Sequence, residues 1–514
     1  MAKEKVAIIG AGPSGLTAAR QALEAGFEPV VLERRNRFGG RWSFTEDKKY
    51  ITHLPSTRTK YSKISSSFSD FPISDHFPQF LSQPEVLEYL ENYVEKFDLK
   101  KFIKLETNVV GIRRHKKYDD NGIFVVDYEK SGQRYSEEFP YVLLALGRTH
   151  KPWRPNPYRK EKEFKGKISH SAEYKGNSAF EGQKVVIVGF GDSAVEIAND
   201  LSFVAKKVII CARHGEWLNY RADPSGHPLD HEFNSRFMGN LRKIVPKPVF
   251  NKIWEKYSLS QLNLEQHGVE RPTFGYWNTI PTFADGLKEH LKSGKIRFEK
   301  DFLSFDEKSV EFSDRKAENN VDHVIFCTGY EFDFSLLENG TMIRVRDNDS
   351  QLYLHMFDPE ISRGNLAIIG LANPFGPNWP IAELQARVFF ALHRAVWTLP
   401  SEFFMRERAE WKRCQISVGF LKTRRHTQIE DFIGFSEELA DKIGAKIPWK
   451  LWVSDPVLAY KSLVAPFSPA QYRICGPNSN PQAREYVMAL KSNDFSVFWI
   501  AFVVFVIILA WFLK

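Results

Sequence analysis

Two copies of a unit made of a strand, a glycine turn, a helix and a strand constrain the fold of this chain more than any other feature. The first copy has an apolar strand over 5–9, the turn Gly10-Ala11-Gly12-Pro13-Ser14-Gly15, a helix over 16–25 and a strand over 28–32 that ends at Glu33. In this G-x-G-x-x-G pattern the glycines allow a tight turn, bring a diphosphate close to the backbone and let helix and strand pack. The unit is predicted to bind a dinucleotide, with Glu33 accepting hydrogen bonds from the adenosine ribose.

The second copy ends in a base instead of an acid. A strand over 184–188 leads into Gly189-Phe190-Gly191-Asp192-Ser193-Ala194, a helix over 195–203 and a strand over 207–211, and Arg213 follows. Alanine at the sixth position of the motif is allowed. A base at this place suits the 2′-phosphate of NADPH, and the other interpretation of Arg213 is a surface charge after a strand. An acid after one copy and a base after the other is typical of a flavoprotein that binds FAD first and NADPH second.

These units predict an α/β fold with two Rossmann-like dinucleotide-binding domains, one for FAD and one for NADPH, followed by a C-terminal transmembrane helix. The predicted FAD-binding domain is split into 1–150 and 331–470, and the NADPH-binding domain, 151–330, lies between its two parts. Prolines at the end of the chain predict an irregular linker over 471–494, before the membrane anchor over 495–513.

The membrane anchor is predicted from an apolar run near the C-terminus. Residues 495–513 carry no charge, and Trp499 and Trp511 lie near the two ends of the run, as interfacial aromatic residues do. As a helix the run is about 28 Å long, enough to span a thin bilayer. Because only Lys514 follows, we expect a tail-anchored protein with its catalytic body in the cytosol, and the short span suits the endoplasmic reticulum. The other interpretation is a buried core helix.

Composition excludes several other classes of protein. Hydrophobic residues make up 43% and charged residues 26% of the chain, as in ordinary globular enzymes. The four cysteines are scattered and form no C-x-x-C pair, which excludes a dithiol redox site and a zinc ribbon, and no metal site is predicted. The net charge of +8 is not gathered in one basic arm, so no nucleic-acid partner is expected.

A further motif lies between the two glycine turns and gives a resemblance to a known family. Residues 164–174 fit the pattern F-x-G-x-x-x-H-x-x-x-Y, and with the glycine turns they resemble the flavin-containing monooxygenase family. The related Baeyer–Villiger group usually has Trp where this chain has Tyr174. Shorter segments that also look familial are Gly39-Gly40-Arg41-Trp42, Ser69-Asp70-Phe71-Pro72, Gly215-Glu216-Trp217, Phe326-Cys327-Thr328-Gly329-Tyr330 and Pro380-Ile381-Ala382-Glu383-Leu384-Gln385.

The resemblance implies an NADPH- and O2-dependent flavin monooxygenase that oxygenates soft nucleophiles, an amine nitrogen or a sulfide sulfur, through a C4a-(hydro)peroxyflavin. The cofactor carries the difficult chemistry, and the protein supplies position, dryness and electrostatics. The alternatives are an NADPH oxidase that releases H2O2, a Baeyer–Villiger enzyme that oxygenates ketones, and a non-catalytic nucleotide sensor on a membrane. The expected partners are O2, small nucleophilic substrates and a lipid bilayer, and an oligomer remains possible.

One position departs from the family pattern at the expected flavin site. Family members usually have Asn nine residues before the serine of S-D-F-P, and this chain has Lys60 nine residues before Ser69. An amide both donates and accepts hydrogen bonds, whereas an ammonium only donates and carries charge. Lys60 is therefore the candidate catalytic residue: it stabilises a reduced anionic flavin, changes the lifetime of the peroxide, or points to solvent. Tyr61 and Ser62 are the candidates for a replacement hydrogen bond.

The remaining expectations concern binding residues and an aromatic stretch. The resemblance implies that the motif around His170 links the two domains, so His170 is interpreted as structural and not as a catalytic base. The aromatic residues between 233 and 283 either line an access path or belong to the core, with the core as the default. The expected cofactor-binding residues are Gly10, Ala11, Gly12, Pro13, Ser14, Gly15, Glu33, Gly40, Arg41, Trp42, Lys60, Tyr61, Val109, Gly189, Gly191, Asp192, Ser193, Ala194, Arg213 and Gln385.

Overall fold

The structure is a computed structural model that describes residues 3–361 and 363–491. A five-stranded parallel sheet organises the part that contains the first glycine turn, which we call the first half; the part that contains the second glycine turn is the second half. The strand order of this first sheet is β20-β7-β1-β2-β3. Both faces of the sheet are covered, and its central strands are continuous apolar runs, as in buried parallel sheets. The strands are β1 (Lys5–Ile9), β2 (Glu28–Leu32), β3 (Ile103–Lys104), β7 (Tyr141–Leu144) and β20 (Leu366–Ile368).

A second five-stranded parallel sheet repeats this arrangement with the order β14-β11-β10-β18-β9. In each sheet the strand before a glycine turn is central, and the strand after the following helix lies beside it. The strands are β9 (Lys167–His170), β10 (Lys184–Val188), β11 (Lys207–Cys211), β14 (Ile296–Glu299) and β18 (His323–Phe326). The repeat extends to a three-stranded antiparallel sheet in each half: β4 (Thr107–Arg114), β5 (Phe124–Lys130) and β6 (Gln133–Phe139), and β15 (Phe302–Phe305), β16 (Ser309–Phe312) and β17 (Ala317–Asn319).

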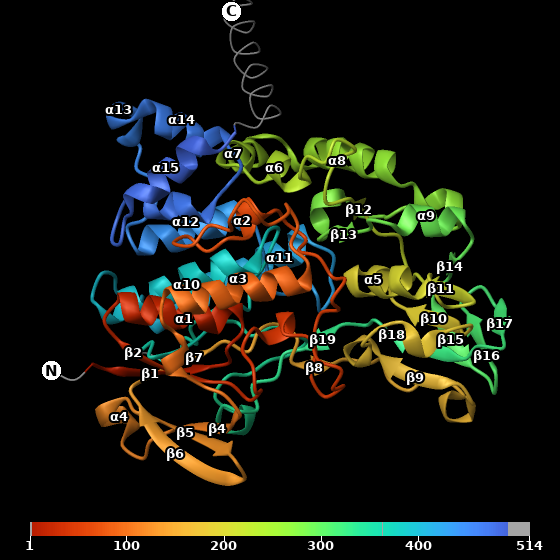
Figure 1. Cartoon of the computed structure of the whole chain (residues 1–514), viewed down its shortest axis with the longest axis horizontal. Helices are drawn as coiled ribbons and strands as arrows, with labels where there is room; N and C mark the ends of the chain where they lie inside the picture. The colour runs from red at the N-terminus through yellow and green to blue at the C-terminus, as the bar shows by residue number, and fades with distance from the viewer. Residues whose placement is uncertain (1–2, 362, 492–514) are drawn as a thin grey trace, which may run out of the picture.

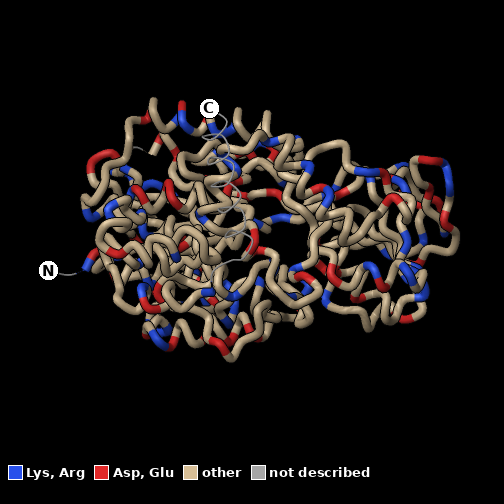
Figure 2. Tube along the Cα trace, turned by 90° about the horizontal axis from the view of Figure 1, so that it is seen from above, with Lys and Arg blue, Asp and Glu red and all other residues tan. Residues whose placement is uncertain are grey.

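Helices cover one side of both sheets (Figure 1). The helices α1 (Pro13–Glu24), α3 (Gln83–Lys96) and α10 (Asn378–His393) lie above the first sheet, with the antiparallel strands β4–β6 below it, and α5 (Asp192–Leu201) lies above the second sheet. Two short antiparallel strands, β8 (Lys151–Pro152) and β19 (Tyr330–Glu331), pair where the chain crosses between the halves. Seen from above, the two halves lie side by side (Figure 2). The fold is therefore a mixed α/β fold.

Most aromatic residues between 233 and 283 belong to the core, and Phe237, Tyr257 and Phe274 are partly buried against it. They lie on and around α6 (Leu229–Phe233), α7 (Arg236–Ile244) and α8 (Lys247–Gln261). Trp254 stacks on Tyr276 with ring centroids 5.6 Å apart, and Trp277 lies 5.2 Å from Phe375. All four side chains are buried in one hydrophobic cluster. The default interpretation of this stretch as core is therefore confirmed.

The segment predicted as an irregular linker, 471–494, is ordered structure as far as Lys491, so the prediction was wrong for this part. It contains the end of the 3-10 helix η9 (Pro469–Arg473) and the helix α15 (Pro481–Ala489). Pro469 and Pro481 are the first residues of these helices, where proline costs no hydrogen bond, and this is why they misled the sequence analysis.

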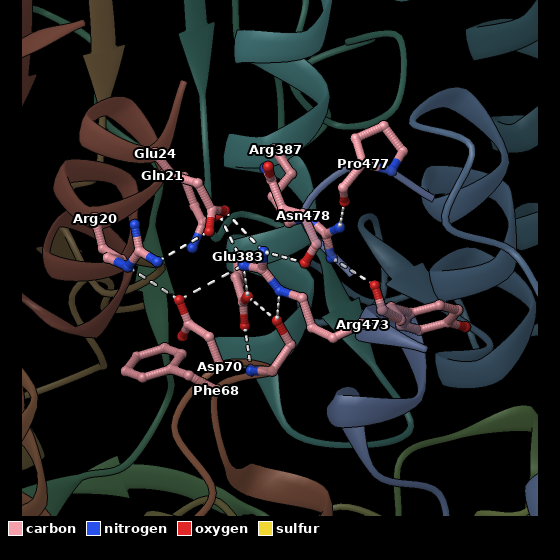
Figure 3. Close-up of polar contacts among 12 residues, drawn as sticks. Arg20, Gln21, Glu24, Phe68, Asp70, Glu383, Arg387, Arg473, Pro477 and Asn478 are labelled. Carbon is pink, nitrogen blue, oxygen red and sulfur yellow. Dashed lines mark hydrogen bonds and ion pairs between the residues drawn. The ribbon is translucent and has the colours of Figure 1, made fainter. Parts of the chain in front are cut away.

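Arg473 fastens this segment to the first half of the fold (Figure 3). Its side chain is 1% exposed. Its Nη1 donates to Glu24 Oε2 of α1 (2.8 Å), its Nη2 to Glu383 Oε1 of α10 (3.3 Å), and its Nε to Ser69 Oγ (2.8 Å). Asp70 lies 3.6 Å from the same guanidinium. One side chain near the C-terminus therefore ties together two helices and the S-D-F-P turn.

The predicted membrane anchor, 495–513, lies outside the described residues. Within 3–361 and 363–491, no helix combines the length and the apolar character needed to cross a bilayer.

The other described elements are either short or come after the second sheet in the sequence. They are α2 (Lys63–Ser66), α4 (Tyr118–Asn121), α9 (Leu287–Lys292), α11 (Glu402–Gly419), α12 (Phe432–Lys442), α13 (Leu451–Ser454), α14 (Pro456–Val464), β12 (Leu218–Asn219), β13 (Thr282–Phe283), β21 (Asn373–Pro374), β22 (Ile429–Glu430), η1 (Gly40–Trp42), η2 (Lys100–Phe102), η3 (Glu161–Glu163), η4 (Ser171–Glu173), η5 (Ser178–Phe180), η6 (Leu264–His267), η7 (Tyr276–Asn278) and η8 (Glu338–Gly340).

Candidate functional site

A cleft of about 890 Å³ lies between the two halves, and residues of both glycine turns line it. The turns follow β1 and β10, so the cleft lies at the carboxyl ends of the strands, where open α/β sheets bind ligands. Of the expected cofactor-binding residues, those that line the cleft are Gly10, Gly12, Pro13, Ser14, Glu33, Gly40, Arg41, Trp42, Lys60, Tyr61, Val109, Asp192 and Ser193.

At the first glycine turn, backbone atoms approach too closely for side chains. Gly10 has φ +102°, and a Cβ there would lie 2.8 Å from the carbonyl oxygen of Ala145. A Cβ on Gly15 would overlap the carbonyl oxygen of Gly10, so this glycine lets α1 pack on β1. No side chain caps the N-terminus of α1. Its free N–H groups and its positive dipole end at the cleft, which fits a diphosphate.

Glu33 lies at the end of β2 and is held by the backbone. Its Oε2 accepts the N–H of Ala11 (2.8 Å), and its Oε1 accepts the N–H of Arg35 (2.9 Å). These bonds hold the Glu33 carboxylate in the lining of the cleft, and Ala11 lies behind that lining. A carboxylate has about four acceptor positions, so two remain for hydroxyl groups of a ligand.

The second glycine turn repeats this geometry. Gly189 has φ +112°, and a Cβ there would lie 2.7 Å from the carbonyl oxygen of Cys327, as a Cβ on Gly10 would from Ala145. No side chain caps α5 at Gly191. Gly189, Gly191 and Ala194 lie behind the lining of the cleft, and Asp192 and Ser193 reach it.

Lys60 connects the two halves across the cleft. Its Nζ lies 2.5 Å from Oδ2 of Asp192, in the first turn of α5, and Arg425 Nη2 lies 3.4 Å from the same oxygen. Burial raises the pKa of Asp192, but Lys60 and Arg425 outweigh burial and lower it to about 2. The Lys60 side chain is 39% exposed, so it lies at the cleft in an ion pair and does not simply point to solvent.

His53 is a cleft residue that the sequence analysis did not single out. Its ring lies against Trp42 with centroids 4.3 Å apart, and both residues line the cleft. Burial, followed by the charges of Arg41 and Lys60, holds the pKa of His53 well below its usual value. The imidazole is therefore neutral at pH 7. No local sequence signal marks it, because His53 lies in an irregular loop.

Arg148 is a second cleft residue that was missed. It follows β7, the neighbour of β1, and its Nη1 donates to Asn373 Oδ1 (2.6 Å). Burial and the charges of Arg425 and Arg41 lower the pKa of Arg148 to about 9. No carboxylate among the described residues pairs with it. The signal that could have found Arg148 is the apolar strand before Gly147. The carboxyl ends of neighbouring parallel strands share one edge of a sheet, so a residue just after this strand is expected near the first glycine turn.

Two expected cofactor-binding residues lie away from the cleft. Gln385 is fully buried, and its Oε1 accepts the N–H of Gly370 (2.9 Å) while its Nε2 donates to Leu354 O (3.1 Å). It therefore supports Gly370, which lines the cleft, instead of facing the cleft itself. Arg213 is exposed just after β11 and makes no hydrogen bond or ion pair within the described part of the chain.

His170 has a structural setting. Its Nδ1 accepts the N–H of Ala172 (3.1 Å) at the end of β9, and burial lowers its pKa to about 4. Just after the motif, Lys175 Nζ donates to Tyr50 O of the first half (2.6 Å). His170 does not line the cleft.

The sequence matches a known protein family over nearly its whole length. The profile of the flavin-binding monooxygenase-like family matches residues 3–501. Flavin-containing monooxygenase 5 of Rattus norvegicus is 34% identical over 497 residues, which cover 96% of this chain and 93% of that protein. Dimethylaniline monooxygenase [N-oxide-forming] 2 of Mus musculus is 35% identical over 498 residues, 96% of this chain and 92% of that protein.

Solved structures with the same fold have lower identity. S-allyl-L-cysteine S-oxygenase from Allium sativum superposes with a TM-score of 0.65 at 23% identity, covering 95% of this chain and 99% of that one. Cyclohexanone monooxygenase from Rhodococcus sp. Phi1 bound to NADP+ has a TM-score of 0.62 at 16% identity, covering 86% and 98%. These likenesses establish the fold.

Proposed function

Because the chain belongs to the flavin-binding monooxygenase-like family and is an FAD-dependent monooxygenase that uses NADPH, we propose that it oxygenates soft nucleophiles, an amine nitrogen or a sulfide sulfur. One oxygen atom of O2 joins the substrate, and the other leaves as water at the expense of NADPH and a proton. Bound FAD supplies the redox chemistry. The observation that carries the proposal is the single cleft onto which both uncapped helix N-termini open. The name of the N-oxide-forming relative supports the amine nitrogen.

We assign FAD to the first glycine turn. The residues fit its adenosine diphosphate, because Glu33 presents free acceptor positions and a Cβ on Gly40 would lie 3.0 Å from Gly12 Cα, where backbone and ligand must come close. Trp42 and His53 present two neighbouring aromatic rings, tilted by 35° to each other, to the cleft near this turn. A neutral imidazole there can donate or accept a hydrogen bond without adding charge.

We assign NADPH to the second turn, with Arg213 binding the 2′-phosphate. Arg213→Ala is expected to raise the KM for NADPH about 10- to 100-fold, the loss of a charge-assisted hydrogen bond, and to change the KM for NADH little. Steady-state oxidation of both nucleotides measures this. Arg315→Ala, at an arginine that is 72% exposed, is the matched control. An equal rise for both nucleotides would contradict the assignment.

Lys60 is proposed to act as a positioning residue at the junction of the two cofactors. Asp192 lies in the first turn of α5, where a free carboxylate would repel the diphosphate of NADPH. The Lys60 ammonium neutralises this carboxylate and holds the two halves at one distance. If this pair does not form, we expect the alternative NADPH oxidase activity, in which H2O2 is released instead of an oxygenated product.

An assay of the flavin-loaded protein in detergent tests the proposal. NADPH consumption is measured with and without a tertiary amine or a thioether, and peroxide is assayed in parallel. We expect oxygenated product to account for most of the NADPH. Peroxide equal to NADPH with both substrates would instead establish an oxidase for them. Lys60→Asn is expected to slow flavin reduction by NADPH, and Asp192→Asn in that background is expected to restore it; slow reduction in both variants would sink the pairing role.

The proposal includes a membrane location. It rests on the uncharged run 495–513, which follows the last described residue, Lys491, after three residues. An anchor there would leave the two cofactor sites in the cytosol.

A further inference from the structure

Arg148 is a cation that lies at the cleft without an opposite charge beside it. It follows β7 and is partly buried. Its Nη1 donates to Asn373 Oδ1 (2.6 Å), and its side chain makes no other hydrogen bond or ion pair within residues 3–361 and 363–491. A charge that is withdrawn from water is costly unless an opposite charge accompanies it. The guanidinium therefore lacks an anion.

The four carboxylates among the described residues that line the cleft have partners of their own. Those of Glu33 and Asp333 accept backbone N–H groups, and that of Asp192 lies between two cations. Glu196 lies 3.9 Å from the guanidinium of Arg221. Within the described part of the chain, none of the four forms an ion pair with the unpaired guanidinium. We therefore expect a ligand to supply the missing anion.

Neighbouring groups fix the Arg148 side chain and add to the positive charge around it. Asn373, in β21, accepts the hydrogen bond from Arg148 and donates its Nδ2 to the carbonyl oxygen of Arg425 (3.2 Å). Arg425 in turn contacts Asp192, so this row of contacts reaches from the first half to the N-terminus of α5. The charges of Arg425 and Arg41 both repel that of Arg148. A cationic ligand would be repelled here, whereas an oxyanion would be attracted.

The phosphates of the two nucleotides have other binding groups in the proposed assignment. The uncapped N-termini of α1 and α5 face the two diphosphates, and Arg213 is assigned to the 2′-phosphate. Arg148 belongs to neither glycine turn, and its partner Asn373 lies in a different sheet from both turns. The ligand that remains to supply an oxyanion at Arg148 is the substrate.

We propose that Arg148 binds a carboxylate of the substrate, so that the substrate is a sulfide or an amine that also carries a carboxylate. This inference rests on the proposed function and narrows its substrate class. A guanidinium and a carboxylate are both planar, and two parallel N–H bonds can join them. In the oxygenation of such a sulfide, one atom of O2 adds to the sulfur, and the other becomes water with two electrons from NADPH and a proton. The carboxylate is unchanged.

Binding of a carboxylate that cannot be oxygenated tests this site independently of the reaction. Hydrocinnamate has a methylene group in place of the sulfur of phenylthioacetate, and hydrocinnamamide is its neutral counterpart. Calorimetry measures the Kd of both for the flavin-loaded full chain. We expect the carboxylate to bind about 10- to 100-fold more tightly than the amide, the range for charge-assisted hydrogen bonds. Arg148→Met should remove this preference, and Arg148→Lys, which keeps the charge without the planar fork, should retain part of it.

Arg58→Met is the matched control. Arg58 also lines the cleft, but it is exposed and donates to the carbonyl oxygen of Phe80 (3.1 Å). We expect this variant to keep the preference of the unaltered protein for the carboxylate. Flavin content and Tm show whether each variant folds. Loss of the preference in Arg58→Met but not in Arg148→Met would overturn the assignment to Arg148.

Oxygenation of phenylthioacetate and phenylthioacetamide then connects the site with the reaction. In Arg148→Met, the ratio of kcat/KM for the acid to that for the amide should fall about 10- to 100-fold. Equal binding of hydrocinnamate and its amide by the unaltered protein would overturn the proposal. Loss of flavin from Arg148→Met would assign the anion to FAD instead, and a higher KM for NADPH with both sulfides would assign it to NADPH. Selective carboxylate binding with peroxide as the only product would overturn the proposed function and leave the carboxylate site standing.

Discussion

Replacement of Arg473 by methionine is expected to lower the free energy of unfolding by about 3–5 kcal/mol, the cost of leaving buried charges without their partner. The Arg473 side chain is 1% exposed and lies among the carboxylates of Glu24, Asp70 and Glu383. Although burial opposes its charge, these carboxylates raise the pKa of Arg473, so it is a cation at every working pH. Methionine has a similar length, but it removes the cation beside Glu383 and leaves Glu24 and Asp70 paired with Arg20 alone.

The loss should depend on pH. Burial and Glu383 raise the pKa of Asp70 to about 6, while Arg473 and Arg20 lower it. A carboxyl whose folded pKa is raised destabilises the fold as pH rises through that value, and without Arg473 the folded pKa rises further. The variant should therefore lose more stability at about pH 8 than at about pH 5.

Denaturant unfolding of the full chain at both pH values measures this prediction. Arg484→Met is the matched control, because the Arg484 side chain is 52% exposed in its pair with Asp455 and is expected to contribute less than about 1 kcal/mol. Equal unfolding free energies of the two variants would show that the cluster in Figure 3 does not fasten the C-terminal segment.

Gly15→Ala is expected to weaken flavin binding on the order of 100-fold. The new Cβ would overlap the carbonyl oxygen of Gly10 and would lie 3.5 Å from the Ala145 Cβ, so α1 must move away from β1. Overpacking of this kind costs about 3 kcal/mol or more. If the free energy of FAD binding falls by the same amount, the affinity for FAD falls on the order of 100-fold.

Substitutions at two other glycines distinguish a loss of protein packing from a direct loss of flavin binding. A Cβ on Gly12 would lie 3.6 Å from Gly40 Cα, an ordinary contact, so Gly12→Ala should keep the stability of the apoprotein and still lose flavin. Gly111→Ala, whose Cβ would lie 3.8 Å from Asp127, should change neither. Flavin content by absorbance and the Tm of the apoprotein are the two readouts. Full flavin content in Gly15→Ala would contradict the assignment of FAD to this turn.

Local motifs were predicted well because their geometry is short-range. A strand, a glycine turn and a helix occupy fewer than about 30 residues, and φ above zero or a close approach of two backbones requires glycine wherever the unit occurs. The α/β fold and both glycine turns were therefore readable from the sequence. The structure places Gln385 behind the wall of the cleft, because a motif does not show which way a side chain points. The linker prediction was wrong because proline both breaks helices and begins them.

The sequence by itself determined the two dinucleotide units, their order and the difference between Glu33 and Arg213, since each depends on residues close along the chain. Only the tertiary structure decided that Lys60 pairs with Asp192, 132 positions away, and that Arg473 joins Glu24, 449 positions away. Such pairs depend on how two sheets and their helices pack. No local preference of the backbone encodes that packing, which follows from burying both apolar cores at once.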